Sequence, residues 1–448
     1  MQKKLMKIGL VLAGIILAWV AVFLLFGNNA QQSKTTLEFW SVFDTSEQME
    51  PLLEDFTAQT GVKVNYRSFT DLRDYRDALL IELASGEGPD VFAIHNTWIP
   101  KYKKFLKPLP AEIGYSLENV ATDFVDAVAD TLILETSDGV QQLFGLPMYL
   151  DSLAVFYNKT YFRNILSKAY PAPELTWNGL RSDAIGLTQV SSGESTGFQL
   201  AGIALGRADN ITRGVDIFYT LYHQLGGPDL TAENTDGFYQ PTAEALNYLT
   251  AFSRNSRNQE YSWSSRITSE LTNKEISAFS RGRVAMIFGF SYYYDAIKAA
   301  IQSREDTIDI SEVGVAPLPQ IGDPLEGNPK LAVADFFTLA VAKSSQYSAD
   351  AWSLILNLTS REAQEQYFAA TKKPTSRRDL INSEKTDKNV GVFAEQAVYA
   401  DTLQLADDEV LDTAVANVLD RIADGEITPT EGASELSTIF QTTISKSE

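Results

Sequence analysis

Three short stretches of sequence decide the fold. They are LEFW at residues 37–40, QMEPLLEDFTAQTG at 48–61 and VKVNY at 62–66. In the middle stretch, apolar residues recur at the spacing of one helical face, at positions 49, 52, 53 and 56. Gly61 ends this pattern, and the flanking stretches have the apolar and alternating patterns of β-strands. We therefore predict a strand, a helix and a second strand.

The same pattern continues along the chain. Residues 74–84 predict another helix, the turn GEGP at 86–89 ends it, and residues 90–94 have the composition of a short buried strand. The resulting order of strand, helix, strand, helix and strand predicts an α/β fold with a mostly parallel sheet. Ligands of such sheets bind beyond the carboxyl ends of the strands.

The chain begins with an apolar segment, residues 8–26, that contains no charged side chain. At about 1.5 Å per residue, a helix of this length crosses a bilayer core. Lys3, Lys4 and Lys7 precede the segment, which places the N-terminus in the cytoplasm. We expect residues 1–35 to form a cytoplasmic tip, a transmembrane anchor and a short linker, with the remainder outside the cytoplasm. The alternative is a cleaved signal segment and a secreted protein.

The composition excludes several classes of protein. The 448 residues include 58 Asp and Glu against 37 Lys and Arg, so the formal net charge is -21. Because nucleic-acid affinity comes mostly from neutralising phosphates, we expect no nucleic-acid partner. Cysteine is absent and only two histidines occur, which excludes disulfides, cysteine-ligated metals and multi-histidine metal sites. We expect no cofactor and no bound metal.

Two patterns typical of hydrolases do not support catalysis. The segment GESTG at 193–197 fits a nucleophile elbow, but the residues before it are polar and only His223 follows as a triad partner. The adjacent carboxylates of Asp407 and Asp408 would diverge on a helix, unlike the facing pair of a glycosidase. We expect a protein that is not an enzyme.

Five blocks of sequence carry a resemblance to a known family. In chain order they are LEFW at 37–40 with TGVKV at 60–64, GEGPDVF at 86–92, FGLP at 144–147 with FYNK at 156–159, FSRGRVAM at 279–286, and GVAPLP at 314–319. The chain resembles the extracellular solute-binding proteins of ABC importers, in their sugar-binding group. The resemblance extends over about residues 36 to 445.

The resemblance implies a two-lobed, periplasmic-binding-protein-like α/β fold with a ligand cleft between the lobes. The chain would cross between the lobes near 145–147, near 332–336 and near Lys373-Pro374. The first lobe would contain residues 36–149 and 336–373, and the second 150–335 and 374–448. The implied function is to capture a sugar or related polyol by lobe closure and to deliver it to the permease subunits of an ABC importer. A monomer is expected.

Side chains that follow the predicted strands are candidate ligand contacts. A sugar site needs aromatic faces, and it needs carboxylates or amides because buried hydroxyls must be paired. The candidates are Trp40, Asp44, Asn96 and Trp98. A core position remains an alternative for Trp40, and a helix cap for Asp44. The neighbouring His95 is expected to be a neutral, hydrogen-bonded side chain.

The resemblance implies six further contacts. They are Tyr149 and Asp151 at the hinge, Tyr292, Asp335, Phe336, and Arg377 after the third crossing. Tyr292 stands where the family carries a stacking aromatic residue, and Asp151 matches an acidic ligand-binding position. Residues 335–337 are Asp-Phe-Phe, where relatives often carry small residues, and these larger side chains predict a smaller cleft or an unusual ligand. For Arg377 a solvated surface position is an alternative.

Two other functions remain open from the sequence. The tyrosine run 292–294 is similar to the tyrosine pairs of ferric-ion-binding proteins, because phenolates are good ligands for hard metal ions. The bulk at 335–337 also suits a surface interaction module of the same fold that does not transport a solute.

Overall fold

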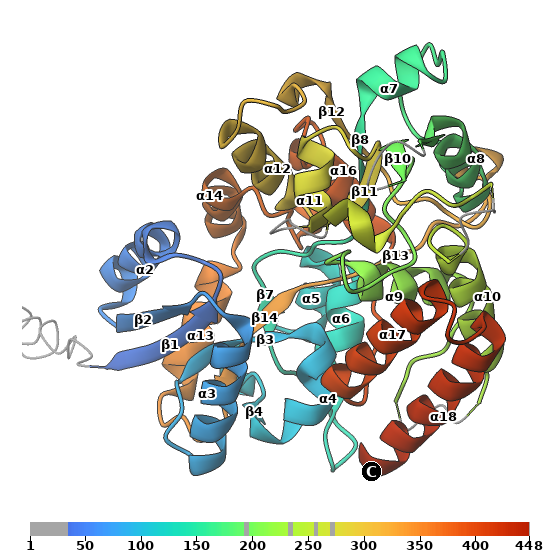
Figure 1. Cartoon of the computed structure of the whole chain (residues 1–448). Coiled ribbons are helices and arrows are strands. Elements are labelled where there is room, and N and C mark those ends of the chain that lie inside the picture. The colour runs from blue at the N-terminus through green and yellow to red at the C-terminus, as the bar shows by residue number, and fades with distance from the viewer. Residues whose placement is uncertain (1–34, 192–196, 232–235, 255–258, 269–273, 448) are drawn as a thin grey trace, which may run out of the picture.

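The computed structural model describes residues 35–447, except 192–196, 232–235, 255–258 and 269–273. Figure 1 shows two lobes, each with strands at its centre and helices around them. The apolar segment 8–26 lies outside the described residues, as does most of the GESTG motif. No helix of the described part of the chain is long and apolar enough to cross a membrane.

The first lobe is built on a sheet with the strand order β2-β1-β3-β14-β4, and β7 pairs with β14. The strands are β1 (Thr36–Val42), β2 (Lys63–Phe69), β3 (Val91–His95), β4 (Leu106–Lys107), β7 (Leu146–Pro147) and β14 (Phe337–Ala342). The β1 strand runs parallel to β2 and β3, whereas β14 runs antiparallel to β3. The predicted order of strands and helices in this unit is confirmed. The chain returns much later to add β14 beside β3.

The first two helices begin at residues that cap them. The α2 helix (Ser46–Thr60) follows Thr45, whose side chain takes part in a capping box, and it ends at Gly61 in the left-handed conformation with φ 75°. The α3 helix (Leu72–Ser85) follows Asp71, whose carboxylate accepts from two backbone N–H groups. Both helices begin earlier than the apolar spacing predicts, because the capping side chain sets the start of a helix.

Further helices cover this lobe on both faces of the sheet (Figure 1). They are α4 (Ile99–Tyr102), α5 (Leu117–Asp123), α6 (Asp126–Leu132), α13 (Ser348–Leu358), α14 (Arg361–Thr371) and α15 (Arg378–Glu384). A small hairpin of β5 (Ile133–Glu135) and β6 (Gln141–Leu143) follows α6.

The second lobe is centred on three antiparallel strands in the order β11-β8-β12. They are β8 (Ala154–Asn158), β11 (Met286–Gly289) and β12 (Val313–Ala316), and a hairpin of β9 (Gln189–Val190) and β10 (Phe198–Leu200) lies nearby. The helices are α7 (Lys159–Asn164), α8 (Trp177–Leu187), α9 (Gly214–Gln224), α10 (Tyr239–Thr250), α11 (Lys274–Ser280), α12 (Tyr293–Gln302), α16 (Gly391–Gln396), α17 (Asp408–Ala423) and α18 (Pro429–Ser447). The last two helices pack on each other and beside α9 and α10 (Figure 1).

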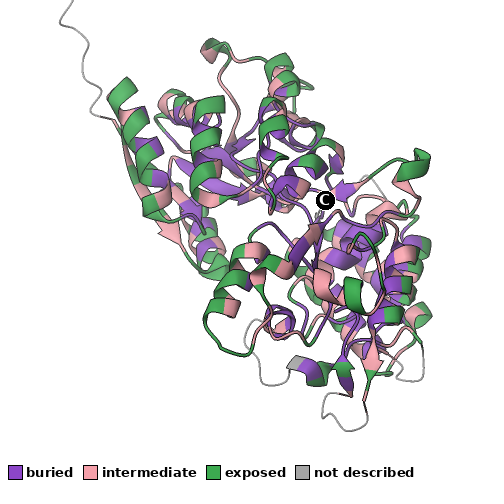
Figure 2. Ribbon diagram, turned by 90° about the horizontal axis from the view of Figure 1, so that it is seen from above, coloured by how far each residue is buried: buried purple, intermediate pink, exposed green. Residues whose placement is uncertain are grey.

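Buried hydrophobic side chains form two separate clusters, one in each lobe. The first draws its members from residues 37–150 and 334–400, and the second from 153–332 and 390–444. Figure 2 shows buried residues along the central strands and exposed residues on the outer helices. Each lobe therefore has its own core, made from two distant parts of the chain.

The segments that connect the lobes are hydrogen-bonded to one another. Asp151 and Asp335 exchange two backbone hydrogen bonds, each with an N–O distance of 2.9 Å. The short strand β13 (Ala332–Val333) pairs in parallel with β15 (Ala400–Asp401). These bonds tie the connecting segments into a hinge, next to which the Leu150 amide donates to the Pro374 carbonyl.

The chain that follows the expected third crossing still contacts the first lobe. The carbonyl of Ser376 accepts from the amide of Val125, and Ile381 belongs to the first hydrophobic cluster. The chain after Pro374 therefore still packs on the first lobe, and it joins the second core only from Val390 onward. The exact lobe boundaries stay a prediction, but this packing argues for a later crossing than Lys373-Pro374.

Candidate solute-binding cleft

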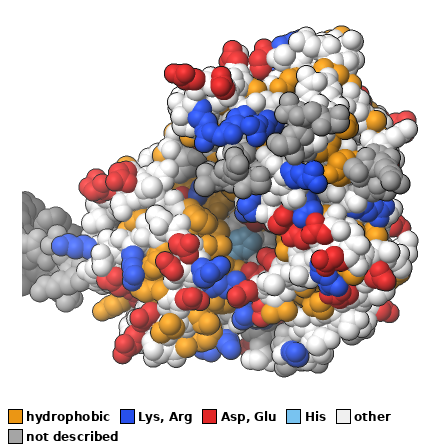
Figure 3. Space-filling view, in the orientation of Figure 1, with side chains coloured by type: hydrophobic (Ala, Val, Ile, Leu, Met, Phe, Trp, Pro, Cys, Tyr) orange, Lys and Arg blue, Asp and Glu red, His pale blue; other side chains and the backbone are white. Residues whose placement is uncertain are grey.

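A cavity of about 940 Å³ lies between the two lobes and is lined by residues of both. Figure 3 shows the molecule hollowed there, with hydrophobic, acidic and basic side chains around the hollow. Residues at the ends of β1, β3 and β14 and on α3 line one side, whereas α9, α17 and the loop after β11 line the other. The cleft therefore lies beyond the carboxyl ends of β1 and β3, as the parallel strand order predicts.

Asp44 is held in place on the first-lobe wall. Its carboxylate accepts from the hydroxyl of Tyr367 at 2.9 and 3.0 Å and forms an ion pair with Lys373 at 2.6 Å. The neighbouring Phe43 has a φ of 72°, a conformation that non-glycine residues rarely adopt, and its side chain is half exposed at the cavity. Its ring meets that of Phe337 at 6.1 Å.

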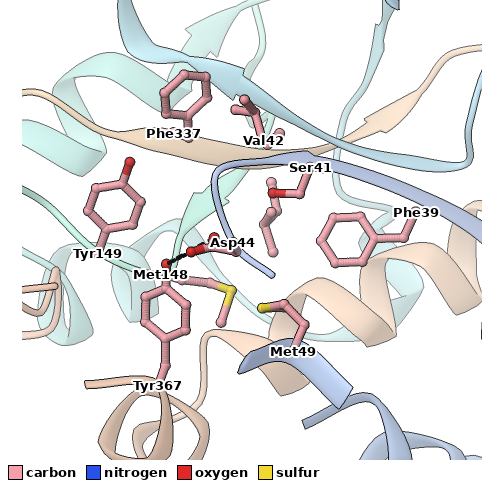
Figure 4. A pocket seen from close by; sticks show the side chains of 11 residues that line it. Phe39, Ser41, Val42, Asp44, Met49, Met148, Tyr149, Phe337 and Tyr367 are labelled. Carbon is pink, nitrogen blue, oxygen red and sulfur yellow. Dashed lines mark hydrogen bonds between the residues drawn. The ribbon is translucent and has the colours of Figure 1, made fainter. Parts of the chain in front are cut away.

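A second, much smaller cavity lies beneath this wall (Figure 4). Its volume of about 10 Å³ is that of a single water probe, so it cannot hold a solute. Figure 4 shows the Tyr367 hydroxyl pointing at Asp44 across it, with Tyr149 and Phe337 nearby. The floor of the cleft is therefore closely packed, and a solute has room only in the large cavity above it.

Two carboxylates mark the hinge. Asp151 accepts from the amide of Ser291 at 2.9 Å, from its hydroxyl at 2.6 Å and from the amide of Ser152 at 2.8 Å. Burial nevertheless raises the pKa of Asp151 to about 7. Asp335 forms an ion pair with His95, Oδ2 to Nε2, at 3.1 Å. Burial alone would raise the pKa of Asp335 and lower that of His95. Their mutual attraction outweighs burial, so the pKa of Asp335 is lowered and that of His95 is raised.

The second-lobe wall carries polar groups from the start of α9, where Arg213 immediately precedes the helix and Asp216 and Tyr219 lie in it. Arg213, Asp216 and Tyr219 lie one turn apart and all line the cavity. The Arg213 guanidinium pairs with Asp216 at 3.4 Å and lies 5.5 Å from the ring centre of Phe290. The half-exposed ring of Tyr292 lines the same wall.

Direct contacts join the two lobes at α17. The indole N–H of Trp98 donates to Asp408 Oδ2 at 2.7 Å, and Arg76 forms an ion pair with Asp408 at 2.7 Å. A second ion pair between the lobes joins Lys101 and Asp407, with an N–O distance of 3.0 Å. Trp98 and Asp408 line the cavity, so one end of the cleft is formed by a contact between the lobes.

The structure brings six of the ten predicted ligand contacts to this cavity. They are Asp44, Trp98, Tyr149, Asp151, Tyr292 and Asp335. They come from five distant parts of the chain, as expected of a cleft between lobes.

The other four predicted contacts are not among the residues that line the cavity. Trp40 packs on Phe69 with Arg67 over its ring, and the Asn96 amide bonds to the backbone of Ala334 and Phe336. Phe336 is fully buried in the first core. Arg377 is buried, pairs with Asp379 at 3.0 Å and donates to the carbonyl of Thr359. Packing and internal hydrogen bonds account for all four.

Several residues that line the cavity were not predicted from the sequence. They are Phe43, Arg76, His95, Arg213, Asp216, Tyr219, Phe290, Phe337, Asp408 and Asp412. Asp408 and Asp412 could have been paired from the sequence, because they stand four residues apart on a predicted helix and therefore share one of its faces. Arg76 and the residues of α9 could not have been found in this way, because nothing in the neighbouring sequence distinguishes them from polar residues of other amphipathic helices.

The tyrosine run 292–294 does not present a pair of phenol groups to the cavity. Tyr293 is fully buried and donates to Glu275 at 2.7 Å, so only Tyr292 of the run faces the cavity. Within the described part of the chain, no group of three His, Cys, Asp or Glu side chains is placed to hold a metal ion.

Two lobes, each with its own core and with a large cavity between them, have the architecture of a protein that binds a solute between its lobes. The family of bacterial extracellular solute-binding proteins matches residues 44–365, most of the chain. The chain belongs to this family, whose members bind solutes and are not enzymes. No protein of curated function matches the chain significantly.

Solved structures show the same fold. The sugar-binding protein MalE from Xanthomonas citri has a TM-score of 0.74 at 20% identity, with 92% of this chain and 98% of that chain covered. The cyclic α-maltosyl-1,6-maltose binding protein from Arthrobacter globiformis has a TM-score of 0.71 at 18% identity, with 92% and 99% covered. An ABC substrate-binding protein from Listeria monocytogenes in complex with cycloalternan has a TM-score of 0.70 at 16% identity, with 92% and 100% covered.

Proposed function

We propose that this protein is the substrate-binding component of an ABC importer and that its ligand is a carbohydrate or a related polyol. The observation that carries the proposal is the composition of the interlobe cavity. Aromatic rings from both lobes, Trp98 and Phe337 on one wall and Phe290 and Tyr292 on the other, alternate with carboxylates. Aromatic faces suit the apolar face of a sugar ring, and carboxylates accept hydrogen bonds from hydroxyls.

The ligand would be held by side chains of both lobes and of the hinge. Asp44 and Tyr149 contribute from the first lobe, Tyr292 from the second, and Asp151 and Asp335 from the connecting segments. Because a ligand between the walls bonds to both, it favours the closed arrangement of the lobes. The sugar-binding neighbours of the same fold support this assignment.

Delivery to a permease and attachment to the membrane complete the proposal. The closed, liganded protein would dock on the permease, and the apolar segment 8–26 would anchor it or direct its export. Comparing the membrane and soluble fractions of cells that express the full-length chain distinguishes an anchor from a cleaved signal.

Thermal unfolding of the purified full-length protein with a ligand panel tests the proposal. The panel contains neutral and basic mono- and oligosaccharides, polyols, short peptides and Fe³⁺. A ligand at about a thousand times its Kd stabilises the folded state by about 4 kcal/mol, a shift of several degrees. We expect a shift with one class of sugar, and its loss in Asp151→Ala and Tyr292→Ala.

The matched control is Tyr170→Ala, because Tyr170 is 89% exposed and lies outside the cavity. It should keep the ligand response of the wild type. A shift with Fe³⁺ alone, or no shift with any sugar or polyol, would contradict the proposal. The second result would instead favour a surface module that transports no solute.

A further inference from the structure

The acidic side chains of the cleft outnumber their cationic partners. Four carboxylates gather where α9 and α17 meet the end of β3 and the hinge. Three have a cation beside them: Asp216 with Arg213 at 3.4 Å, Asp335 with His95 at 3.1 Å, and Asp408 with Arg76 at 2.7 Å. The fourth, Asp412, takes part in no ion pair with a described residue. One carboxyl group in this part of the cavity therefore has no cation paired with it among the described residues.

The surroundings of Asp412 are unfavourable for its own charge. Burial and the nearby carboxylates Asp216 and Asp408 raise the pKa of Asp412 to about 7, against smaller opposing effects of Tyr219 and His95. These groups come from α9, α17 and β3, the elements that face Asp412. A cation placed beside Asp412 would relieve both the burial of its charge and the repulsion.

Tyr219 is a second indication of a ligand beside Asp412. The residue is only 6% exposed, and it lines the same cavity. Its hydroxyl lies close enough to Asp412 to affect the pKa of that carboxyl, but it forms no hydrogen bond of good geometry with any described residue. A buried hydroxyl without a partner is costly, and a ligand N–H or O–H in the cavity would pair with it.

Aromatic rings complete the site for a cation. Trp98 and Phe337 line the same cavity, and their ring centres lie 5.8 Å apart at an angle of 85°. The face of an aromatic ring attracts a cation, and Arg76 already lies 4.8 Å from the centre of the Trp98 ring. The rings therefore favour a cation in this cavity, and at Trp98 Arg76 already takes that place.

We infer that the ligand is a saccharide that carries a protonated amine, and that Asp412 and Tyr219 bind this amine. The inference rests on the proposed function and narrows its ligand class. Hydroxyl groups alone would satisfy Tyr219, but they would leave the charge of Asp412 uncompensated. A protonated amine satisfies both, because it can donate one charge-assisted hydrogen bond to the Asp412 carboxylate and another to the hydroxyl oxygen of Tyr219.

Isothermal titration of the full-length protein with matched sugar pairs tests the inference. The pairs are glucosamine and glucose, galactosamine and galactose, mannosamine and mannose, and oligomers of glucosamine against their N-acetylated forms. At neutral pH we expect the amine-bearing member of one pair to bind about tenfold tighter or more. Asp412→Asn should remove this preference while leaving the affinity for the neutral member.

Glu54→Gln is the matched control, because it removes the same charge at an exposed position of α2 outside the cavity. It should keep the preference. Equal or tighter binding of the neutral member to the wild type would overturn the inference and leave the proposed function intact. Binding of no sugar at all would overturn both. Binding of a simple diamine such as putrescine as tightly as the best amino sugar would overturn the saccharide assignment.

If Asp412→Asn fails to fold, the comparison of amine-bearing and neutral sugars on the wild-type protein still tests the inference. A second variant, Tyr219→Phe, should weaken binding of the amine-bearing member. It should leave the far-ultraviolet circular dichroism unchanged, because the hydroxyl that it removes forms no hydrogen bond of good geometry with a described residue.

Discussion

Trp98 of the first lobe and Asp408 of the second are joined by a hydrogen bond of 2.7 Å from the indole nitrogen to the carboxylate. Arg76 pairs with the same carboxylate, and its guanidinium lies over the Trp98 ring. All three side chains line the cleft. The contact between the lobes and the wall of the candidate site are therefore built from the same residues, so we expect lobe closure and ligand binding to be coupled through them.

Replacement of Asp408 should favour the open arrangement of the lobes. Asp408→Asn leaves the partly buried Arg76 without its closest anionic partner, at a cost of about 1–3 kcal/mol to the closed state. We expect a larger radius of gyration in small-angle scattering and a ligand affinity about 5- to 100-fold weaker, since fewer molecules are competent to bind. Lys101→Ala is the control, because its more exposed ion pair with Asp407 contributes little. An unchanged scattering profile in Asp408→Asn would argue against the coupling.

Tyr367 is predicted to position Asp44 rather than to touch the ligand. Tyr367→Phe removes the hydroxyl that donates to both oxygens of Asp44, whereas the ion pair with Lys373 remains. We expect ligand affinity to fall about 3- to 10-fold, which corresponds to the net worth of one hydrogen bond. Titration calorimetry measures this, and Tyr347→Phe, at a half-exposed position outside the cavity, is the control. Equal affinities in the two variants would show that Asp44 needs no such support.

Asp151 should make the protein less stable as pH rises. Its pKa in the folded state, about 7, lies above the ordinary value of 3.8, so between these values the folded state binds more protons than the unfolded one. The free energy of unfolding therefore falls as pH rises through this window. Asp151→Asn should flatten the decline, by at most about 1.4 kcal/mol for each unit of pKa difference. Chemical denaturation at a series of pH values measures the slope, and an identical slope in the variant would contradict the assignment.

The ion pair of His95 and Asp335 should stabilise the folded state only within a range of pH, because its contribution is lost at both higher and lower pH. The pKa of His95 is raised, so its contribution to stability is lost as pH rises through that value; the pKa of Asp335 is lowered, so its contribution is lost at acid pH. The pair should stabilise the fold most between about pH 4 and 6.5. Because the chain has two histidines, NMR can follow each ring separately.

In Asp335→Asn the pKa of His95 should fall, since burial then acts without the opposing carboxylate. The His223 signal is the internal control, because its own partner is Asp401 at 3.0 Å. A His95 titration that does not move in this variant would show that the pair does not form in solution.

The first unit of the fold could be predicted from the sequence because its determinants are local. The apolar face of α2, the capping residue Thr45 and the stop at Gly61 lie within one short stretch of chain. The alternating pattern of β2 and the apolar run of β3 likewise depend only on neighbouring residues. The same local blocks carry the resemblance to the solute-binding family, so the class of protein followed from them.

The orientation of single side chains could not be predicted in the same way. Phe336 and Phe337 are adjacent, but successive side chains of an extended chain point to opposite faces, so one is buried in the core and the other lines the cleft. Trp40 and Trp98 both follow or end strands, yet only Trp98 reaches the cavity. A one-residue difference in register decides the first case. In the second case Trp40 lies within β1, whereas Trp98 lies in the short helical turn 96–98 that follows β3.

By itself the sequence determined the α/β order of the first unit, the acidic and cysteine-free character of the chain, and its membership of a family of solute-binding proteins. Only the tertiary structure decided which side chains share the cleft. Asp412, Tyr219 and Arg76 belong to α17, α9 and α3, and the folding of both lobes brings these helices to one cavity. The physical reason is that helix caps and strand patterns act between neighbouring residues. A binding site instead depends on contacts between distant segments, which form only when the whole chain has packed.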